Sequence, residues 1–521
     1  MARCPYCLSP NPGNSSICHS CGRVILGAGG MTMRLEPSMP GGYRAHGPRR
    51  GPPPGLSSRR GGKRRVAKKK NNLRSMVLVI AVAFLFLFTP AQDRISTQLQ
   101  KWMDELMDQF GPAREYPVYA AYTVERNVYL NNPYSQSISF SYNLPIPSVR
   151  TDFGNSEFGF ETQDGDPYPV VTLQEVVSMV VSLKQGSNHV NLPMMEEYLL
   201  AENAQPLGSS TEIFWPPIGE NSDRCTVSRC AIWQGEIGPG QMVILNVTYD
   251  VVSSSFSWWG DSAAPEEAPR AAFGLSIHSG NDGNYDDYQR AGRLDSMYDQ
   301  FGSVSKWYDR DPGQSNNWAI QGENNVVEAW ADEIDSGLNP ESEQNSPYEF
   351  AHAAFIKVRD SIIYKKGLSP ARSGPACIVD GIGDCDEQSN AWMSLLRARN
   401  IPSWYEMGPM TNGDFNGWEA HAWANVIFPL DEQWCMAKMI DLTTCFVEGE
   451  VDVVNNRWLL HTPTTLTEWI ETPSHNGEIN FDYYRPLSMG CGGQCWTETW
   501  ETIGSPDISG GTYRVPHIIG E

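Results

Sequence analysis

The sequence predicts a multidomain protein in which a cysteine-rich module and one apolar segment precede an all-β domain and an α+β domain. Two Cys-x-x-Cys pairs lie near the start, an uninterrupted apolar run follows a basic stretch, and β-branched runs then give way to helical periodicity. The 521 residues also exceed one ordinary compact domain. The predicted divisions are a cysteine-rich module (1–26), a disordered basic linker (27–74), a transmembrane helix (75–91), an amphipathic helix (92–112), a β-sandwich (115–260), an acidic connecting region (261–345), an α+β domain (346–505) and a tail (506–521).

Charge is distributed unevenly along the chain. The net charge is −22, yet residues 1–75 contain fifteen Lys and Arg against one acid, Glu36, which leaves a strong acidic excess for the remainder. Such asymmetry predicts that the two parts occupy different surroundings. The acidic excess argues against a nucleic-acid partner for the larger part.

The first element is a pair of cysteine knuckles, and its four cysteines are Cys4, Cys7, Cys18 and Cys21. Two Cys-x-x-Cys turns supply the four thiolates that a tetrahedral Zn²⁺ site needs, so a zinc ribbon is predicted, with two disulfides as the alternative. Four cysteine ligands leave no open position, so the zinc would be structural. The block resembles zinc ribbons at the N-termini of membrane proteins.

The second element is the apolar run Met76–Phe88. Its thirteen residues give roughly 20 Å of helix, which Ser75 and Thr89–Ala91 extend toward a minimal membrane span. A basic stretch precedes it, namely Lys63, Arg64, Arg65, Lys68, Lys69, Lys70 and Arg74. We therefore expect a single span with the N-terminus inside, because positive charge flanks the cytoplasmic end of such spans. A cleaved secretion signal is the alternative.

The next elements are an amphipathic helix and a set of strands. Apolar residues recur at helical spacing from Ile95 to Phe110. This spacing predicts an amphipathic helix that lies on the membrane surface or packs on the outer domain. Residues 115–260 contain short β-branched and aromatic runs separated by Asn, Pro and Gly, the pattern of a β-sandwich. The acidic stretch 280–287 lacks the ligand order of a calcium loop, so a solvated loop is favoured and any Ca²⁺ dependence stays open.

The α+β domain contains a candidate nucleophile. Gly381 and Gly383 form a loop, and Cys385 falls where a helix begins, with Trp392 on its buried face and Pro402 beyond its end. The unpaired N–H groups and the dipole of a helix N-terminus stabilise a thiolate and a developing oxyanion. A cysteine at this position is therefore suited to nucleophilic catalysis, provided that a base is near.

The candidate base is His421, at the start of an alternating run that reads as a strand through Phe428. Asp441 lies late in a second short apolar run. Two neighbouring strands would place Asp441 beside His421, where it would fix the imidazole tautomer while the histidine accepts the thiol proton.

This segment resembles the transglutaminase-like superfamily core, a papain-like thiol fold. Around the helix, the family has Gly-x-Cys, Leu-Leu-Arg-Ala and Ile-Pro, and this chain has Gly383 with Cys385, Leu395–Ala398, and Ile401 with Pro402. Further along, the family has His-Ala-Trp and then Trp…Asp-x-Thr, and this chain has His421–Trp423 and then Trp434, Asp441 and Thr443. The resemblance covers about residues 346–445 and implies Cys385 as nucleophile, His421 as general base and acid, and Asp441 as orienting residue. The chain departs from the family at Asn400, where glycine is usual, at Trp404, where a basic residue is usual, and in a long Trp434-to-Asp441 gap.

Eight cysteines remain outside the ribbon. Three pairs are close enough in sequence for local disulfides, namely Cys225 with Cys230, Cys435 with Cys445, and Cys491 with Cys495. Together with Cys377 they make seven cysteines besides Cys385. An odd number predicts at least one free thiol or an intermolecular bond.

The sequence as a whole predicts a single-pass cell-membrane protein with a large extracellular thiol enzyme domain. A protein or peptide amide would be its substrate, with hydrolysis, deamidation or acyl transfer as the outcome. The competing hypothesis is a non-catalytic surface scaffold or adhesion protein with a degenerate domain. A third makes the zinc ribbon a cytoplasmic sensor.

Overall fold

The computed structural model describes residues 2–3, 10–11, 115–147, 149–151, 163–164, 172–192, 205–214, 230–258, 277–290, 319–338, 345–367, 372–471, 487–489 and 495–515. The chain divides into two compact units, Met1–Leu106 and Met107–Glu521. In the first unit, the described backbone consists of β1 (Ala2–Arg3) paired antiparallel with β2 (Pro10–Asn11).

Several predictions for the N-terminal part fall on residues that the structure does not describe. These are Cys4, Cys7, Cys18 and Cys21, the linker 27–74, the span 75–91 and the helix 92–112. Among the helices that are described, none has the length and apolar character needed to cross a membrane.

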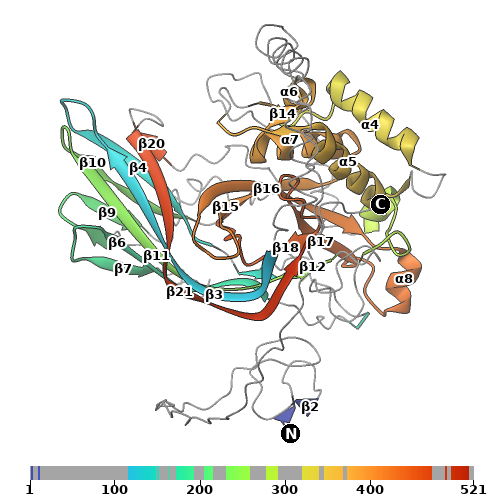
Figure 1. Cartoon of the computed structure of the whole chain (residues 1–521), viewed down its shortest axis with the longest axis horizontal. Coiled ribbons are helices and arrows are strands. Elements are labelled where there is room, and N and C mark those ends of the chain that lie inside the picture. Colours follow the sequence, from blue (N-terminus) through green and yellow to red (C-terminus); the bar gives the residue numbers. More distant parts are fainter. Residues whose placement is uncertain are drawn as a thin grey trace, which may run out of the picture. The chain divides into compact units, whose positions relative to one another are not determined.

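The β-rich part of the second unit consists of two antiparallel sheets (Figure 1). Their strands are β3 (Glu115–Asn131), β4 (Ile138–Pro145), β5 (Arg150–Thr151), β6 (Thr172–Leu183), β7 (His189–Leu192), β8 (Gln205–Leu207), β9 (Thr211–Phe214), β10 (Cys230–Ile237), β11 (Met242–Ser254), β20 (Leu487–Met489) and β21 (Trp496–Arg514). The strand orders are β20-β4-β10-β9-β8 and β21-β3-β11-β6-β5, with β7 beside β6. Val124 of β3 and Trp233 of β10 belong to one apolar core, so the two sheets pack on each other as predicted for residues 115–260.

The C-terminal segment belongs to these sheets and not to the α+β domain. β21 pairs with β3 along its length, and β20 pairs with β4. The predicted boundary between residues 505 and 506 therefore falls inside a strand and is wrong. Most described side chains of β21 are exposed or half-buried, so the segment has little of the apolar alternation that would have identified it.

The α+β part combines a helical layer with a mixed set of short strands. Its helices are η4 (Tyr285–Arg290), α4 (Asn325–Gly337), α5 (Pro347–Ser361), α6 (Gly374–Asp380), α7 (Cys385–Ala398) and α8 (Glu432–Ala437). Its strands are β12 (Phe256–Ser257), β13 (Ile363–Tyr364), β14 (Ile382–Gly383), β15 (Ser403–Met410), β16 (Glu419–Pro429), β17 (Phe446–Val451), β18 (Leu460–His461) and β19 (Trp469–Ile470). The main sheet has the order β17-β16-β15-β19.

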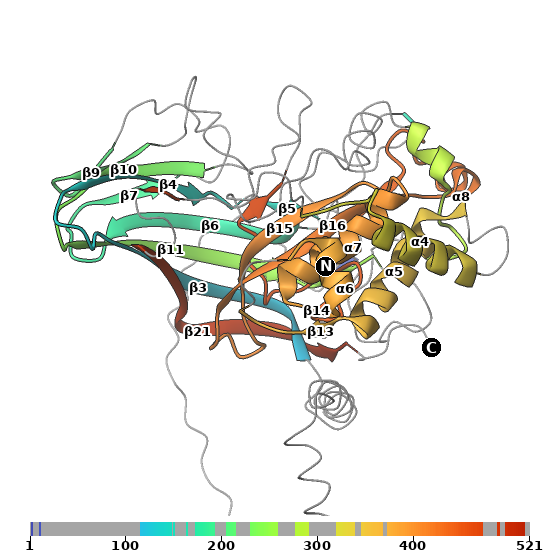
Figure 2. The same cartoon turned by 90° about the horizontal axis from the view of Figure 1, so that it is seen from above.

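Helix α7 lies at the centre of this part, against α4, α5, α6 and β16 (Figure 2). Its predicted buried face is confirmed, since Trp392, Leu395 and Leu396 are fully buried. Helix α4 falls within the predicted connecting region 261–345, yet it packs on α7 and contributes Val327 and Ala331 to the same core. The α+β domain therefore begins before residue 346.

Buried polar contacts join the sandwich to the α+β part. Arg126 of β3 forms an ion pair with Glu468 at 2.8 Å. The side-chain amide of Gln174 donates to the Thr467 carbonyl at 2.9 Å and accepts from the Thr467 N–H at 2.7 Å. Strand β12 also pairs with β18. These contacts fix the loop before β19 and hence the edge of the main sheet.

The cysteine predictions are confirmed in part. Cys435 and Cys445 form a disulfide, and Cys230 and Cys495 are disulfide-bonded as well. Their expected partners Cys225 and Cys491 lie outside the described residues. Among the described cysteines, Cys377 and Cys385 are free, the former buried and the latter partly exposed.

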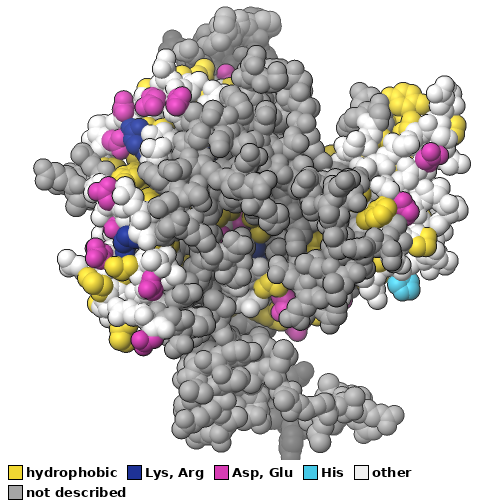
Figure 3. Space-filling model, turned by 180° about the vertical axis from the view of Figure 1, so that it is seen from behind, with side chains coloured by type: hydrophobic (Ala, Val, Ile, Leu, Met, Phe, Trp, Pro, Cys, Tyr) yellow, Lys and Arg dark blue, Asp and Glu magenta, His cyan; other side chains and the backbone are white. Residues whose placement is uncertain are grey.

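Described acidic side chains lie at several places on the face drawn in Figure 3. Figure 3 shows described Asp and Glu side chains scattered among uncharged ones on one face, with few Lys or Arg between them. The described part of this face therefore shows no concentrated basic patch.

Candidate functional site

The free thiol of Cys385 lies at the first residue of α7. Glu387 fixes this helix start, because its carboxylate accepts from the N–H of Asp384 at 2.8 Å and from the N–H of Arg372 at 3.0 Å. The main-chain carbonyl of Asp384 already accepts the helical bond from Gln388 at 3.0 Å. The thiol is thus held at the positive end of the helix dipole, as the sequence predicted.

The loop before Cys385 is held by a short parallel strand pair. β13 pairs with β14, and the N–H of Lys365 donates to the Gly383 carbonyl at 3.0 Å. Gly383 has no substitute here, since a Cβ at this position would lie 2.6 Å from the sulfur of Cys377. The glycine therefore allows the loop to pack directly on the buried layer beneath the thiol.

His421 enters the site from β16, where it lies opposite Gly408 of β15. A Cβ on Gly408 would lie 1.9 Å from the Leu466 carbonyl oxygen, so the close approach of the following loop requires glycine. The imidazole is buried, with 8% of the residue exposed, and stacks on Trp423 at 5.7 Å between ring centres. Burial and this stacking contact therefore restrict the orientation of the ring.

Asp452 is the carboxylate that contacts His421. It follows β17 directly, and its Oδ2 lies 2.8 Å from the Nε2 of His421. The Asn455 side-chain amide lies 3.2 Å from the same ring nitrogen and donates to Asp452 at 2.7 Å. Since Nε2 faces the carboxylate, Nδ1 is the ring nitrogen left to face the thiol.

Electrostatics couple the three groups. Burial alone would lower the pKa of His421, but the negative charges of Asp452 and Cys385 and hydrogen bonds with both raise the pKa to about 9. Burial would likewise raise the pKa of Asp452, yet His421 and Arg457 hold that pKa well below its ordinary value. The imidazolium form of His421 is therefore favoured at neutral pH, beside the Asp452 carboxylate.

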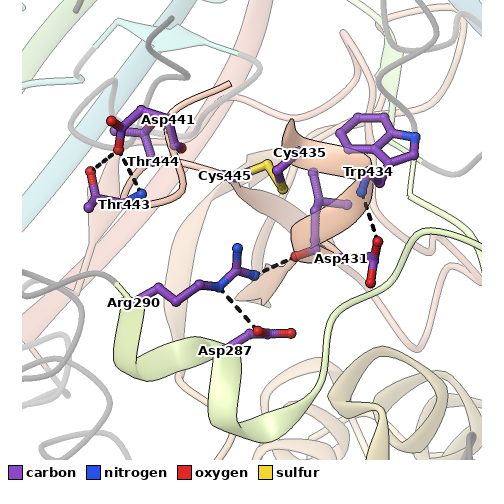
Figure 4. Close-up of a disulfide and its surroundings, with 10 residues drawn as sticks. Asp287, Arg290, Asp431, Trp434, Cys435, Asp441, Thr443, Thr444 and Cys445 are labelled. Atoms are coloured by element: carbon purple, nitrogen blue, oxygen red, sulfur yellow. Dashed lines mark hydrogen bonds and ion pairs between the residues drawn. A yellow bond between two sulfur atoms is a disulfide. The ribbon is translucent and has the colours of Figure 1, made fainter. Parts of the chain in front are cut away.

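Asp441 does not occupy the position predicted for it. Its carboxylate accepts from the N–H and hydroxyl of Thr443 at 2.8 and 2.5 Å, in the connection beside the Cys435–Cys445 disulfide (Figure 4). This connection follows the far end of β16, since β17 starts opposite Pro429 and returns toward His421. At about 3.3 Å per residue, the length of β16 separates Asp441 from the histidine, so its predicted orienting role is wrong.

Sequence reasoning missed Asp452, Asn455 and Arg457. The available signal was the run from Phe446 to Val454, which alternates acids with apolar residues and reads as a strand. Paired antiparallel with the strand of His421, its C-terminal end meets the histidine. The segment between β16 and β17, where a strand with Asp441 was expected, is a helix followed by a loop that the Cys435–Cys445 disulfide closes.

The structure explains one of the positions at which this chain departs from the family pattern. Asn400 adopts φ +55° after α7, a left-handed conformation in which asparagine is the usual replacement for glycine. Trp404 is buried, and nothing in the structure explains the loss of a basic residue there.

One grouping of the described residues has metal-ligand atoms close together, namely Asp384, Cys385 and Asp386, within 4.8 Å of one another. Its thiol is the candidate nucleophile. In the stretch 280–287, the carboxylate of Asp287 accepts from the Asn284 N–H at 2.7 Å and pairs with Arg290 at 3.1 Å. Asp287 is therefore occupied by contacts within the fold.

Comparison with known proteins supports the resemblance over part of the chain. A crystal structure from Cytophaga hutchinsonii, described as a "Putative Cysteine Protease", aligns with TM-score 0.36 and 10% identity over 77% of this chain and 94% of that one, too weak a likeness to support an argument about activity. No curated protein matches the chain. The family described as Transglutaminase-like superfamily matches residues 329–439, so the chain is similar to that superfamily over the segment that contains Cys385 and His421.

Proposed function

We propose that the protein is a thiol enzyme that acts on protein or peptide amides through a thioester on Cys385. The observation that supports it most is the buried contact of 2.8 Å between His421 and Asp452 beside a free thiol at a helix N-terminus. Catalysis by a thiol needs a nucleophile, a base and a carboxylate that orients the base, and these three side chains have the chemistry for those roles. The match to the transglutaminase-like family supports the same chemistry.

In the proposed reaction, the sulfur of Cys385 attacks the amide carbonyl carbon while His421 already holds the proton, because its raised pKa favours the imidazolium at neutral pH. The tetrahedral intermediate collapses as the C–N bond breaks, and His421 returns the proton to the departing amine. Backbone N–H groups at the start of α7 are suited to stabilise the oxyanion. Water or an amine then attacks the thioester and releases the cysteine.

Hydrolysis, deamidation and acyl transfer share the first half of this scheme. They differ in the amide attacked and in the nucleophile that resolves the thioester. The proposal therefore names a substrate class, protein or peptide amides, and leaves the acceptor to experiment.

The proposal is tested with the full chain and its Cys385→Ala variant. Both are incubated with a peptide mixture containing glutamine, with and without a primary amine, and mass spectrometry follows cleavage, ammonia loss and amine incorporation. We expect at least about a 10³-fold loss of every product in the variant. Equal activity of the two proteins would contradict the proposal, as would no product from either, the result expected of a binding scaffold.

We also propose that the N-terminal part holds a structural Zn²⁺ and a single membrane span, with the second unit outside the cell membrane. The pairing of Ala2–Arg3 with Pro10–Asn11 on either side of the first Cys-x-x-Cys pair in sequence supports the ribbon. The Cys435–Cys445 disulfide supports an oxidising location. Zinc analysis of a Cys4→Ser/Cys7→Ser variant and protease digestion of intact cells test the two statements.

A further inference from the structure

A tight turn follows Asp452 and returns the chain to the same carboxylate. The N–H of Asp452 donates to the Arg457 carbonyl at 2.8 Å, and the N–H of Arg457 donates back at 2.9 Å. Asn456 adopts φ +53° within the turn and accepts from the Arg359 guanidinium of α5 at 3.0 Å. The backbone thus fixes Asp452 and Arg457 side by side.

The Arg457 guanidinium contacts the oxygen that meets the histidine. Its Nε lies 3.2 Å from Oδ2 of Asp452, and its Nη2 also binds this atom. Its Nη1 donates to the Thr462 hydroxyl at 2.8 Å, and the residue is 1% exposed. One carboxylate oxygen is therefore shared between a buried guanidinium and the imidazole of His421.

We propose that Arg457 is a positioning residue of the candidate thiol site, which holds the Asp452 carboxylate with a two-nitrogen fork and shares its negative charge with His421. This inference rests on the proposed function, because it concerns the same three groups. The Asn455 side-chain amide also donates to this carboxylate, at 2.7 Å, but it is neutral; the fork adds two charge-assisted donors with a fixed geometry.

The contact of Arg457 with Asp452 affects the pKa of His421. Interactions with Asp452 and then with Cys385 raise the pKa of His421, while Arg457 in turn faces Asp452, Glu450 of β17 and the Tyr116 phenol of β3. Without the guanidinium, the full charge of Asp452 would act on the imidazole and raise its pKa further. An imidazolium held too strongly is a poor donor of a proton to the leaving amine.

The test compares Arg457→Gln, which removes the charge, with Arg457→Lys, which keeps the charge and removes the fork. Arg359→Gln is the matched control, since this arginine supports the same turn without touching Asp452. Iodoacetamide alkylation of Cys385 is followed from pH 5 to 10 by peptide mass spectrometry. This readout needs no substrate, so it separates failure of this inference from failure of the amide chemistry, which Cys385→Ala tests.

In Arg457→Gln, we expect the alkaline change in Cys385 reactivity, where His421 loses its proton, to move upward by about one pH unit. In Arg457→Lys, we expect this change at the wild-type pH, with alkylation below it slowed several-fold because the carboxylate is held less firmly. Arg359→Gln should follow the wild-type profile. An unshifted profile in Arg457→Gln would overturn the shared charge, and a wild-type rate in Arg457→Lys would overturn the fork, even if Arg457→Gln fails to fold.

Discussion

Asp452 stands 31 residues after His421 in sequence, yet its carboxylate is the one that contacts the imidazole. Asp441 is nearer in sequence and fits a family pattern, but it forms a local turn with Thr443. Contact with the imidazole therefore follows strand register and not distance along the chain.

The two aspartates therefore form a matched pair of variants. We expect Asp452→Asn to lower the rate of amide turnover by about 10²–10⁴-fold, because the amide would favour the wrong imidazole tautomer and remove the charge beside it. Asp441→Asn should leave turnover within about two-fold. Steady-state rates on one peptide substrate give the comparison, and an equal loss in both variants would contradict the assignment of Asp452.

Sequence reasoning located two of the three groups. Cys385 is marked by a helix start after a Gly-x-Cys pattern, and His421 by strand alternation, and both signals are local. The orienting carboxylate depends on how two strands pair across an interruption that contains α8 and a disulfide. Such pairing is a tertiary property, which short-range patterns do not fix.

At the scale of elements, the connection between β16 and β17 decides where Asp452 lies. The Cys435–Cys445 bond closes this connection (Figure 4). The N–H of Leu430 donates to the Cys445 carbonyl at 3.1 Å. β17 begins at the next residue, Phe446. The disulfide thus constrains the segment that leads into the strand of Asp452.

We expect the Cys435→Ala/Cys445→Ala double variant to lose about 2–3 kcal/mol of unfolding free energy, because the cross-link restricts the unfolded chain. Urea denaturation at one pH measures the loss. Both sulfurs are buried, so Met436→Ala, an exposed change on the same helix, serves as the control. A double variant as stable as the wild type would show that the connection is held by its packing alone.

At the scale of the whole molecule, buried carboxylates lie where the sandwich meets the α+β part. Glu406 binds Arg150 of β5, and Glu468 binds Arg126 of β3. Burial outweighs these arginines and raises the pKa of each glutamate to about 7. Burial also raises the pKa of Glu471 to about 8, although its carboxylate accepts from the Tyr405 N–H at 3.1 Å.

These groups predict how stability depends on pH. Their pKa values are higher in the folded chain than in the unfolded chain, so the folded state binds more protons. Their contribution to stability is complete below about pH 4.5 and is lost as the pH rises through 7 to 8. We therefore expect the urea midpoint to fall between pH 5.5 and 8.5.

Glu471→Gln should flatten this dependence, since the amide cannot ionise and its oxygen can still accept from the Tyr405 N–H. The exposed Glu432→Gln is its control. Urea midpoints measured across the same pH range give both slopes. A slope in Glu471→Gln equal to that of the wild type would exclude this carboxyl as a contributor.

The overall architecture was predictable in its larger parts. Strong periodic patterns predicted strands within residues 115–260 and helices at α5 and α7, and the structure has strands and helices there. The return of β21 to pair with β3 was missed, because a polar strand on one edge of a sheet lacks apolar alternation. The packing of α4 on α7 was missed because it depends on contacts distant in sequence.

We propose that Cys385 and His421 act as a thiol–imidazole pair oriented by Asp452. This proposal is tested most directly by alkylating the native full-length chain at pH 6 and comparing Cys385 with the buried free thiol Cys377, in the wild type and in His421→Ala. Burial raises the pKa of Cys377 well above its ordinary value, so this thiol is an internal reference. The account predicts rapid labelling of Cys385 alone and a loss of at least about ten-fold in His421→Ala. Cys385 that stays unlabelled, or that reacts at the same rate without the histidine, would contradict it.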